Sequence, residues 1–173
     1  MKERGLFPDR RMESVAELSP GVLLEGKIRG LIFDIDNTLV PHGEPADEET
    51  VRYFAALHAA GIRTAFVSNN HAPRVAPFAE ATESPFVCDA GKPSRKGFCE
   101  ALRLMGTAAE ETLSVGDQIF TDVWGANRSG IRSILVRPVS RKEPFTVKLK
   151  RFPEKIVLFF FGIHEKRLKK PSA

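Results

Sequence analysis

Short apolar segments alternate with amphipathic segments through the first 140 residues. Five apolar, β-favouring segments lie at residues 27–33, 62–67, 86–88, 112–115 and 131–136. The segments between them carry helix signals, and each apolar segment runs into polar turn residues. Strands and helices that alternate at this spacing predict an α/β fold with a parallel five-stranded sheet, helices on both faces and right-handed crossovers.

Three of the expected helices have a capping residue before them and a glycine after them. The pairs are Asp47 with Gly61, Ser94 with Gly106, and Thr121 or Asp122 with Gly130. Residues 72–82 contain Pro73 and Pro77, which predict a short or irregular helix there.

Charge divides the chain near residue 140. Residues 141–173 hold ten Lys or Arg and three Asp or Glu, a net charge of +7, whereas residues 1–140 have a net charge of −3. We expect one domain over residues 1–140 and a basic amphipathic helical tail over residues 141–173, interrupted by Pro153. The tail is expected to pack on the same domain or at an interface, with an anionic membrane as the alternative contact and nucleic acid less favoured.

The chain carries no pattern of export or of membrane insertion. Its start mixes acids and bases without an apolar core, and its longest apolar run, residues 156–163, is far shorter than the roughly 20 residues that span a bilayer. Cys88 and Cys99 form neither a disulfide framework nor a metal-ligand spacing. We therefore expect a soluble, cytoplasmic protein without a transmembrane segment.

Polar side chains with distinct chemistry follow four consecutive predicted strands. An acid pair, a hydroxyl with an amide, an ammonium and a second acid pair occur in that order, at Asp34 and Asp36, Ser68 and Asn69, Lys92, and Asp117 and Asp122. Because the carboxyl ends of parallel strands lie at one edge of the sheet, we expect these residues to share one site. Turn chemistry alone accounts for each residue singly, but less readily for all four strand ends together.

These residue types suit transfer of a phosphoryl group. Asp34 and Asp117 concentrate negative charge that a hard cation such as Mg²⁺ neutralises, and carboxylate and phosphate oxygens are its preferred ligands. Asp34 is the expected nucleophile toward phosphorus, while Ser68 and Lys92 take up charge on the phosphate oxygens. Asp36, two residues beyond, is the expected general acid and, once deprotonated, the base that activates water.

Two other interpretations of the acidic segments fit the residues less well. A calcium-binding EF-hand loop needs Gly where this chain has Leu39 and Glu where it has Pro45. A phosphoacceptor receiver domain carries its acceptor aspartate after the third strand, where this chain has Lys92.

The motifs resemble those of the haloacid dehalogenase (HAD) superfamily. DIDNTL at 34–39, SNN at 68–70, KP at 92–93 and GDQIFTD at 116–122 match its four motifs in order. The longer stretches GLIFDIDNTLVP and SVGDQIFTDVWGANRSG resemble the YqeG subgroup of type IIIA phosphatases, which is related to the mitochondrial phosphatidylglycerophosphatases. The resemblance covers roughly residues 15–140 and, loosely, the segment around Arg151.

The resemblance implies a Rossmann-like HAD fold, bound Mg²⁺ and a phospho-aspartate intermediate. By matching positions it implies Asp34 as nucleophile, Asp36 as acid and base, Ser68 and Asn69 as phosphate contacts, Lys92 as charge clamp, Asp34, Asp117 and the backbone carbonyl of Asp36 as metal ligands, and Asp122 as a supporting acid.

The segments between motifs leave no room for the cap domain of many relatives, so we expect an open site that admits a bulky phosphomonoester. The resemblance and the basic tail make phosphatidylglycerophosphate one candidate substrate, with peripheral contact at the inner face of the membrane. Two alternatives stay open: a regulatory phosphate-binding module whose tail contacts RNA or anionic membrane, and phosphotransfer to an alcohol. A homo-oligomer is compatible with the sequence.

Overall fold

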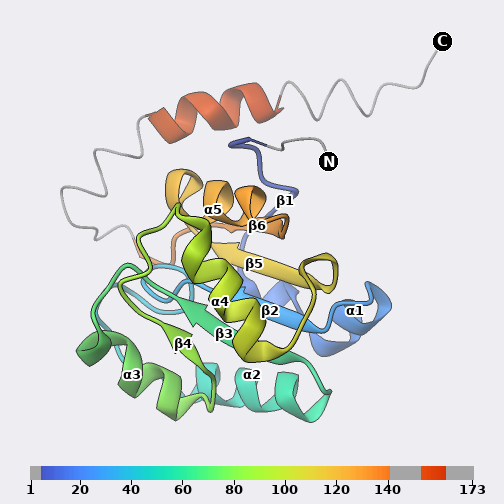
Figure 1. The fold of residues 1–173 in the computed structure, drawn as a ribbon, viewed down its shortest axis with the longest axis vertical. Helices are drawn as coiled ribbons and strands as arrows, with labels where there is room; N and C mark the ends of the chain where they lie inside the picture. Colours follow the sequence, from blue (N-terminus) through green and yellow to red (C-terminus); the bar gives the residue numbers. More distant parts are fainter. Residues whose placement is uncertain (1–4, 141–152, 163–173) are drawn as a thin grey trace. The chain divides into compact units, whose positions relative to one another are not determined.

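A six-stranded parallel sheet forms the centre of the fold (Figure 1). The computed structural model describes residues 5–140 and 153–162. The strands follow the order β1-β6-β5-β2-β3-β4 across the sheet. Their bounds are β1 Arg10–Met12, β2 Gly30–Phe33, β3 Arg63–Val67, β4 Phe86–Val87, β5 Thr112–Gly116 and β6 Arg132–Val136.

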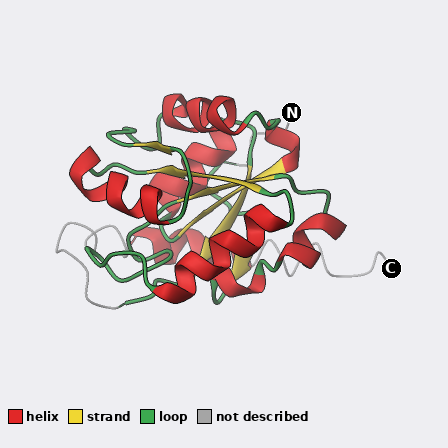
Figure 2. Cartoon of the chain, turned by 90° about the horizontal axis from the view of Figure 1, so that it is seen from below, coloured by secondary structure: helices red, strands yellow, loops and turns green. Residues whose placement is uncertain are grey.

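Helices cover both faces of this sheet, and Figure 2 shows the strands between the two helical layers. The helices are α1 Pro20–Glu25, α2 Glu48–Ala59, α3 Ala72–Ala81, α4 Arg95–Met105 and α5 Trp124–Arg128; short turns are η1 Val15–Glu17, η2 Ala109–Glu111 and the π-helical turn η3 Ile119–Val123. One buried cluster joins α1, α2 and α3 to the sheet, and a second joins α4 and α5 to the opposite face. The expected α/β class is therefore confirmed.

The side chains of β2 point alternately to the two faces of the sheet, which explains why helices cover both faces. Leu31 and Phe33 lie in the cluster under α2 and α3, whereas Ile32 lies in the cluster under α4, and all three are at most 1% exposed. A strand that is apolar on both faces requires helices on both sides, since its side chains point alternately up and down. The carboxyl end of β2 is thereby held rigidly in the middle of the sheet.

Several predicted helix boundaries are confirmed. The carboxylate of Asp47 accepts a hydrogen bond from the Thr50 amide at 2.7 Å, and Ser94 caps α4 by accepting from the Lys96 amide. Gly106 ends α4 in the left-handed conformation at φ 63°.

Three expectations about elements need correction. The sheet has six strands instead of five, because Arg10–Met12 pairs in parallel with β6 as an edge strand. Residues 72–81 form one regular helix despite Pro77, since Val75, Phe78 and Ala79 pack into the core and Pro73 lies in the first turn. The helical segment expected to begin at Thr121 or Asp122 begins at Ile119, so neither residue is an N-cap.

The chain divides into two compact units, residues 1–142 and 143–173. In the second unit, the described part is a helix over residues 153–162 with Pro153 at its start. The rest of the predicted basic tail, residues 141–152 and 163–173, lies outside the described residues, so its amphipathic packing stays a prediction. Within the parts of both units that the structure describes, none of the helices has the length and hydropathy needed to cross a bilayer.

Candidate active site

The site lies where the strand order reverses beside β2. The chain runs from β2 outward through β3 to β4, and then returns to place β5 on the other side of β2. In a parallel sheet such a reversal opens a crevice beyond the carboxyl ends of the strands. Asp34 follows β2, Ser68 follows β3 and Asp117 follows β5, so the topology brings these predicted residues to one edge.

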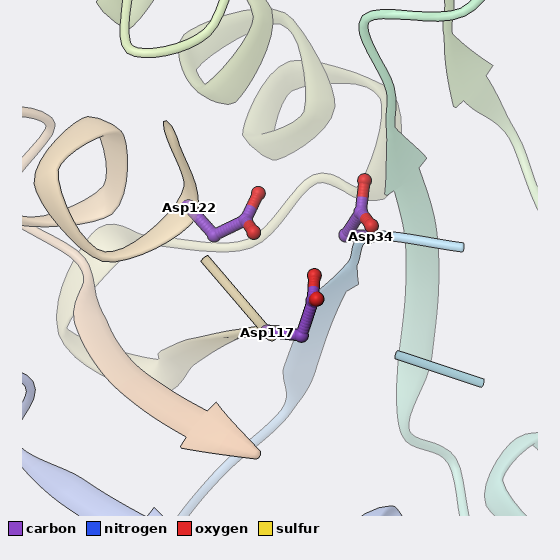
Figure 3. A group of neighbouring side chains, drawn as sticks. All are labelled: Asp34, Asp117 and Asp122. Carbon is purple, nitrogen blue, oxygen red and sulfur yellow. The ribbon is translucent and has the colours of Figure 1, made fainter. Parts of the chain in front are cut away.

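Three carboxyl groups converge at this edge of the sheet (Figure 3). Asp34, Asp117 and Asp122 each offer one oxygen, and these oxygens all lie within 4.8 Å of one another. Asp117 and Asp122 are almost fully buried, at 2% and 4% exposure. The expectation that Asp117 and Asp34 face a common point is therefore met by their geometry.

Gly116 explains how Asp122 enters the cluster. A Cβ atom at Gly116 would overlap the Asp122 side chain, so only glycine leaves room for the π-helical turn η3 to approach the end of β5. The Asp122 carboxylate also accepts a hydrogen bond from the Gln118 amide at 3.1 Å. The GDxxxxD spacing thus aims an acid inward from a turn.

Lys92 is the cation of the cluster. Its Nζ donates to Asp34 Oδ1 and to Asp122 Oδ1, both at 2.6 Å, and its side chain is 4% exposed. Burial by itself would lower the pKa of Lys92, but the carboxylates of Asp122 and Asp34 outweigh burial and raise it. Lys92 is therefore held as an ammonium at neutral pH.

Asp34 is an acid of the cluster whose pKa the surroundings raise. The pKa of Asp34 is raised from the ordinary 3.8 to about 6: burial is the largest cause, Asp122 and Asp36 also raise it, and Lys92 lowers it. Lys92 is the ammonium that bridges Asp34 and Asp122, and with Asp117 as a third acid the buried cluster keeps an excess of negative charge when all three carboxyls are ionised. That donor set of clustered carboxylate oxygens fits a hard divalent cation such as Mg²⁺.

Asn69 and Ser68 hold the main chain around the site. Asn69 accepts from the Lys92 amide at 2.6 Å and donates to the Lys92 carbonyl at 3.3 Å, so its side chain clamps the backbone that presents the ammonium. The hydroxyl of Ser68 is buried and accepts from the Asn70 amide at 3.1 Å. The structure thus gives Asn69 a structural role that the sequence did not indicate, and its contact with phosphate stays a prediction.

Asp36 lies in a different network from Asp34. Its Oδ1 accepts from the Gly43 amide at 2.7 Å and from Arg74 Nη2 at 3.0 Å, and its Oδ2 accepts from Asn70 Nδ2 at 2.6 Å. His42 Nδ1 lies 3.6 Å from Oδ1. Sequence reasoning identified Asp36 but missed these partners, and only the third letter of the SNN motif hinted at Asn70.

Thr38 is a further residue that the sequence reasoning missed. It lies in the DIDNT turn, is 2% exposed and donates from Oγ1 to Asp117 Oδ1 at 3.5 Å. This contact links the turn after β2 to the turn after β5.

Comparisons with known proteins identify the family of the chain. Residues 89–145 match the HAD-hydrolase-like family model. The chain is 36% identical over 159 residues to the probable phosphatase YqeG of Bacillus subtilis (strain 168), covering 91% of this chain and 92% of that protein. It is 29% identical over 150 residues to the chloroplastic phosphatidylglycerophosphate phosphatase 1 of Chlamydomonas reinhardtii, covering 79% of this chain and 56% of that protein.

The fold matches a solved structure as well. The cobalt-bound form of the deoxy-D-mannose-octulosonate 8-phosphate phosphatase from Haemophilus influenzae superposes with a TM-score of 0.52 at 19% identity, covering 74% of this chain and 77% of that one. This likeness concerns the fold, whereas the long match to YqeG concerns the family. The chain therefore belongs to the HAD-like hydrolases, in the group of the probable phosphatase YqeG, and is a phosphatase of that family.

Proposed function

We propose that this protein hydrolyses phosphomonoesters with Mg²⁺ through a phospho-aspartate on Asp34. The observation that carries the proposal is the convergence of three carboxylates whose oxygens lie within 4.8 Å of one another, two of which, Asp34 and Asp122, pair with the buried Lys92. A bound Mg²⁺, for which Asp34, Asp117 and the Asp36 backbone carbonyl are the proposed ligands and Asp122 a supporting acid, would supply charge neutralisation between an anionic nucleophile and an anionic phosphate.

The residues of the cluster divide the first step between them. Asp34 forms a bond from its carboxylate oxygen to phosphorus while the bond from phosphorus to the leaving oxygen breaks. Lys92, already fixed 2.6 Å from Asp34, stabilises negative charge on the phosphoryl oxygens together with the Ser68 hydroxyl. Asn69 keeps Lys92 in place through its backbone.

Asp36 moves the protons in this proposal. As a carboxylic acid it gives its proton to the leaving oxygen, and as a carboxylate it then takes a proton from the water that attacks phosphorus. The second attack releases inorganic phosphate and restores the Asp34 carboxylate. One group thus serves both displacements.

A lipid phosphate is the substrate class we favour. The segment between β2 and α2 is only residues 34–47, and β4 is followed within five residues by Lys92, so neither connection contains a cap domain. An uncapped site admits a headgroup presented at a surface, and the similarity to the Chlamydomonas phosphatidylglycerophosphate phosphatase supports phosphatidylglycerophosphate in particular. The protein would then act at the inner face of a membrane without spanning it.

The chemistry is tested with a chromogenic aryl phosphate. We expect phosphate release that requires Mg²⁺, is abolished by EDTA and is lost in Asp34→Asn, with Asp34 labelled when the intermediate is trapped by rapid acid quench. A matched control is Asp89→Asn, an exposed acid that pairs with His71 and lies outside the carboxylate cluster. Undiminished turnover by Asp34→Asn would contradict the proposal.

The substrate class needs a separate assay. Phosphatidylglycerophosphate in vesicles is compared with soluble sugar, glycerol and nucleotide monophosphates at equal phosphate concentration. A kcat/KM for the vesicle substrate at least about a hundredfold above the best soluble compound, equivalent to about 2.7 kcal/mol, supports the lipid assignment. Hydrolysis confined to the soluble compounds removes the lipid and leaves the chemistry intact.

A further inference from the structure

Arg74 is an arginine of the site that no motif marks. It lies in the first turn of α3, directly beyond the strand-end residues 68–70, and its side chain is only 22% exposed. Its Nη2 donates to Asp36 Oδ1 at 3.0 Å and to the Glu44 carbonyl at 2.8 Å. Its guanidinium lies 5.7 Å from the centre of the buried Phe78 ring, one helical turn further along.

These contacts join three segments that are distant in sequence. Arg74 links the turn after β2, which carries Asp36, to the loop at Gly43 and Glu44 and to the start of α3. The same loop donates its Gly43 amide to the same oxygen, Asp36 Oδ1, at 2.7 Å. The orientation of the Asp36 carboxyl therefore depends on the loop and the helix together, with Arg74 as their common contact.

The placement of Arg74 is not explained by its own hydrogen bonding. Its Nε–H is buried and has no acceptor among the residues that the structure describes. An unsatisfied buried donor is unfavourable, and a guanidinium selected for stability would direct its planar set of donors to full partners. The Arg74 side chain leaves Nε–H unsatisfied while Nη2 bonds to Asp36. This arrangement indicates that the contact with Asp36 has a role in the site.

We propose that Arg74 is a positioning residue for Asp36. This inference rests on the proposed function, in which the Asp36 carboxyl gives its proton to the leaving oxygen as the bond from Asp34 to phosphorus forms. Arg74 fixes the rotation of the Asp36 carboxyl. Oδ1 then stays bonded to Arg74 and the Gly43 amide, and Oδ2 faces Asn70, which follows β3. In this role Arg74 acts through Asp36 and not on the reacting atoms.

Such a role makes the effect of Arg74 depend on the leaving group. A nitrophenolate leaves without a proton, whereas a phenolate gains much more from protonation by a correctly oriented acid. The parameter kcat/KM reports the steps through formation of the phospho-aspartate, so it isolates proton donation from the later attack of water. A purely structural arginine would change both substrates alike.

The test compares Arg74→Ala, Arg74→Lys and the control Arg103→Ala on 4-nitrophenyl phosphate and phenyl phosphate. Arg103 pairs with Glu100 at 2.6 Å in the last turn of α4, at the end of that helix away from Lys92. For Arg74→Ala we expect kcat/KM to fall roughly tenfold to a hundredfold on phenyl phosphate and less than about threefold on 4-nitrophenyl phosphate. Arg74→Lys, which keeps a donor, is expected to recover part of the loss, and Arg103→Ala to change neither substrate.

A double-mutant cycle with Asp36→Asn provides the decisive readout. If Arg74 acts through Asp36, adding Arg74→Ala to Asp36→Asn costs less than about twofold more. Full additivity, an equal loss on both substrates, or a rise in KM alone would overturn the inference. Thermal unfolding is followed in parallel, and Arg74→Lys carries the test if Arg74→Ala does not fold.

The two proposals fail in different ways. Without Mg²⁺-dependent turnover by the unaltered protein, or with turnover that survives Asp34→Asn, the proposed function is wrong. If the unaltered protein is active and the Arg74 variants show losses that do not depend on the leaving group, only the positioning role is wrong.

Discussion

The two aspartates after β2 have nearly the same exposure and opposite surroundings. The side chains of Asp34 and Asp36 are 10% and 12% exposed. Asp34 shares one lysine with Asp122 and lies near a third acid, whereas Asp36 receives donors from Gly43, Asn70 and Arg74. The exposed fraction of the side chain therefore does not distinguish the two residues. Their partners do, because the protein neutralises Asp36 by itself and leaves the cluster of Asp34 with an excess of negative charge that a cation can relieve.

Removing an acid from the cluster of Asp34, Asp117 and Asp122 should have the largest effect on activity. In Asp117→Ala the cluster loses a buried carboxylate, and we expect Mg²⁺ binding to weaken strongly and kcat/KM to fall roughly a thousandfold, in line with the several kcal/mol that a catalytic metal contributes. Isothermal titration with Mg²⁺ and steady-state kinetics measure the two effects. Unchanged affinity in this variant would mean that the cation site lies elsewhere.

Removing the lysine should expose how much negative charge it balances. In Lys92→Met three carboxylates remain without their ammonium, so the free energy of unfolding in EDTA is expected to fall by about 3–5 kcal/mol. Mg²⁺ should restore a larger part of this stability than it adds to the unaltered protein. Urea unfolding with and without Mg²⁺ checks both points, and the exposed Lys96→Met serves as the control, with an expected change within about 0.5 kcal/mol.

The raised pKa of Asp34 predicts a pH-dependent affinity for Mg²⁺. With a pKa of about 6 in the metal-free protein, Asp34 is mostly protonated at pH 5 and mostly ionised at pH 7. A cation must displace that proton, so the affinity should rise about tenfold from pH 5 to pH 7 and then level off. Titrations at several pH values measure the slope, and Asp34→Asn should flatten it over this interval.

The raised pKa of Asp34 affects stability in the opposite direction: as the pH rises, Mg²⁺ affinity increases but the contribution of Asp34 to stability decreases. Because the folded protein holds the Asp34 proton more tightly than the unfolded chain, this group contributes stability at pH values below about 4, and the contribution is lost as the pH rises through about 6. Added Mg²⁺ should reduce the loss, since it favours the ionised form in the folded state.

A substitution among the hydrogen-bond donors of Asp36 should have the smallest effect. Asn70→Ala removes one donor from Asp36 Oδ2 and leaves Gly43 and Arg74 on Oδ1. We expect kcat/KM on phenyl phosphate to fall about threefold to tenfold, with no change in Mg²⁺ affinity. Kinetics and Mg²⁺ titration on the same preparation separate an effect on Asp36 from an effect on the cluster of Asp34. A loss of Mg²⁺ affinity would show that the networks of Asp34 and Asp36 are not independent.

Local signals in the sequence were sufficient for the main elements. Asp47 and Ser94 were recognised as caps because a short polar side chain before an amphipathic segment can satisfy helix amides, and both accept such bonds. The edge strand β1 was missed because three residues, two of them exposed arginines, carry no apolar period. Its parallel pairing with β6 forms across more than 120 residues of chain, which no local pattern records.

The order of apolar and polar segments predicts the class of the fold and the edge of the sheet at which the candidate site lies. Asp34, Ser68 and Asp117 directly follow apolar strands and Lys92 follows β4 after a short loop, so these residues are expected at one edge, because parallel strands share a direction. Which cation pairs with which acid depends on packing in three dimensions, since the hydrogen bonds of Lys92 to Asp34 and of Arg74 to Asp36 join residues 58 and 38 positions apart. Such contacts depend on how helices and loops pack around the strand ends, which the residue types alone leave open.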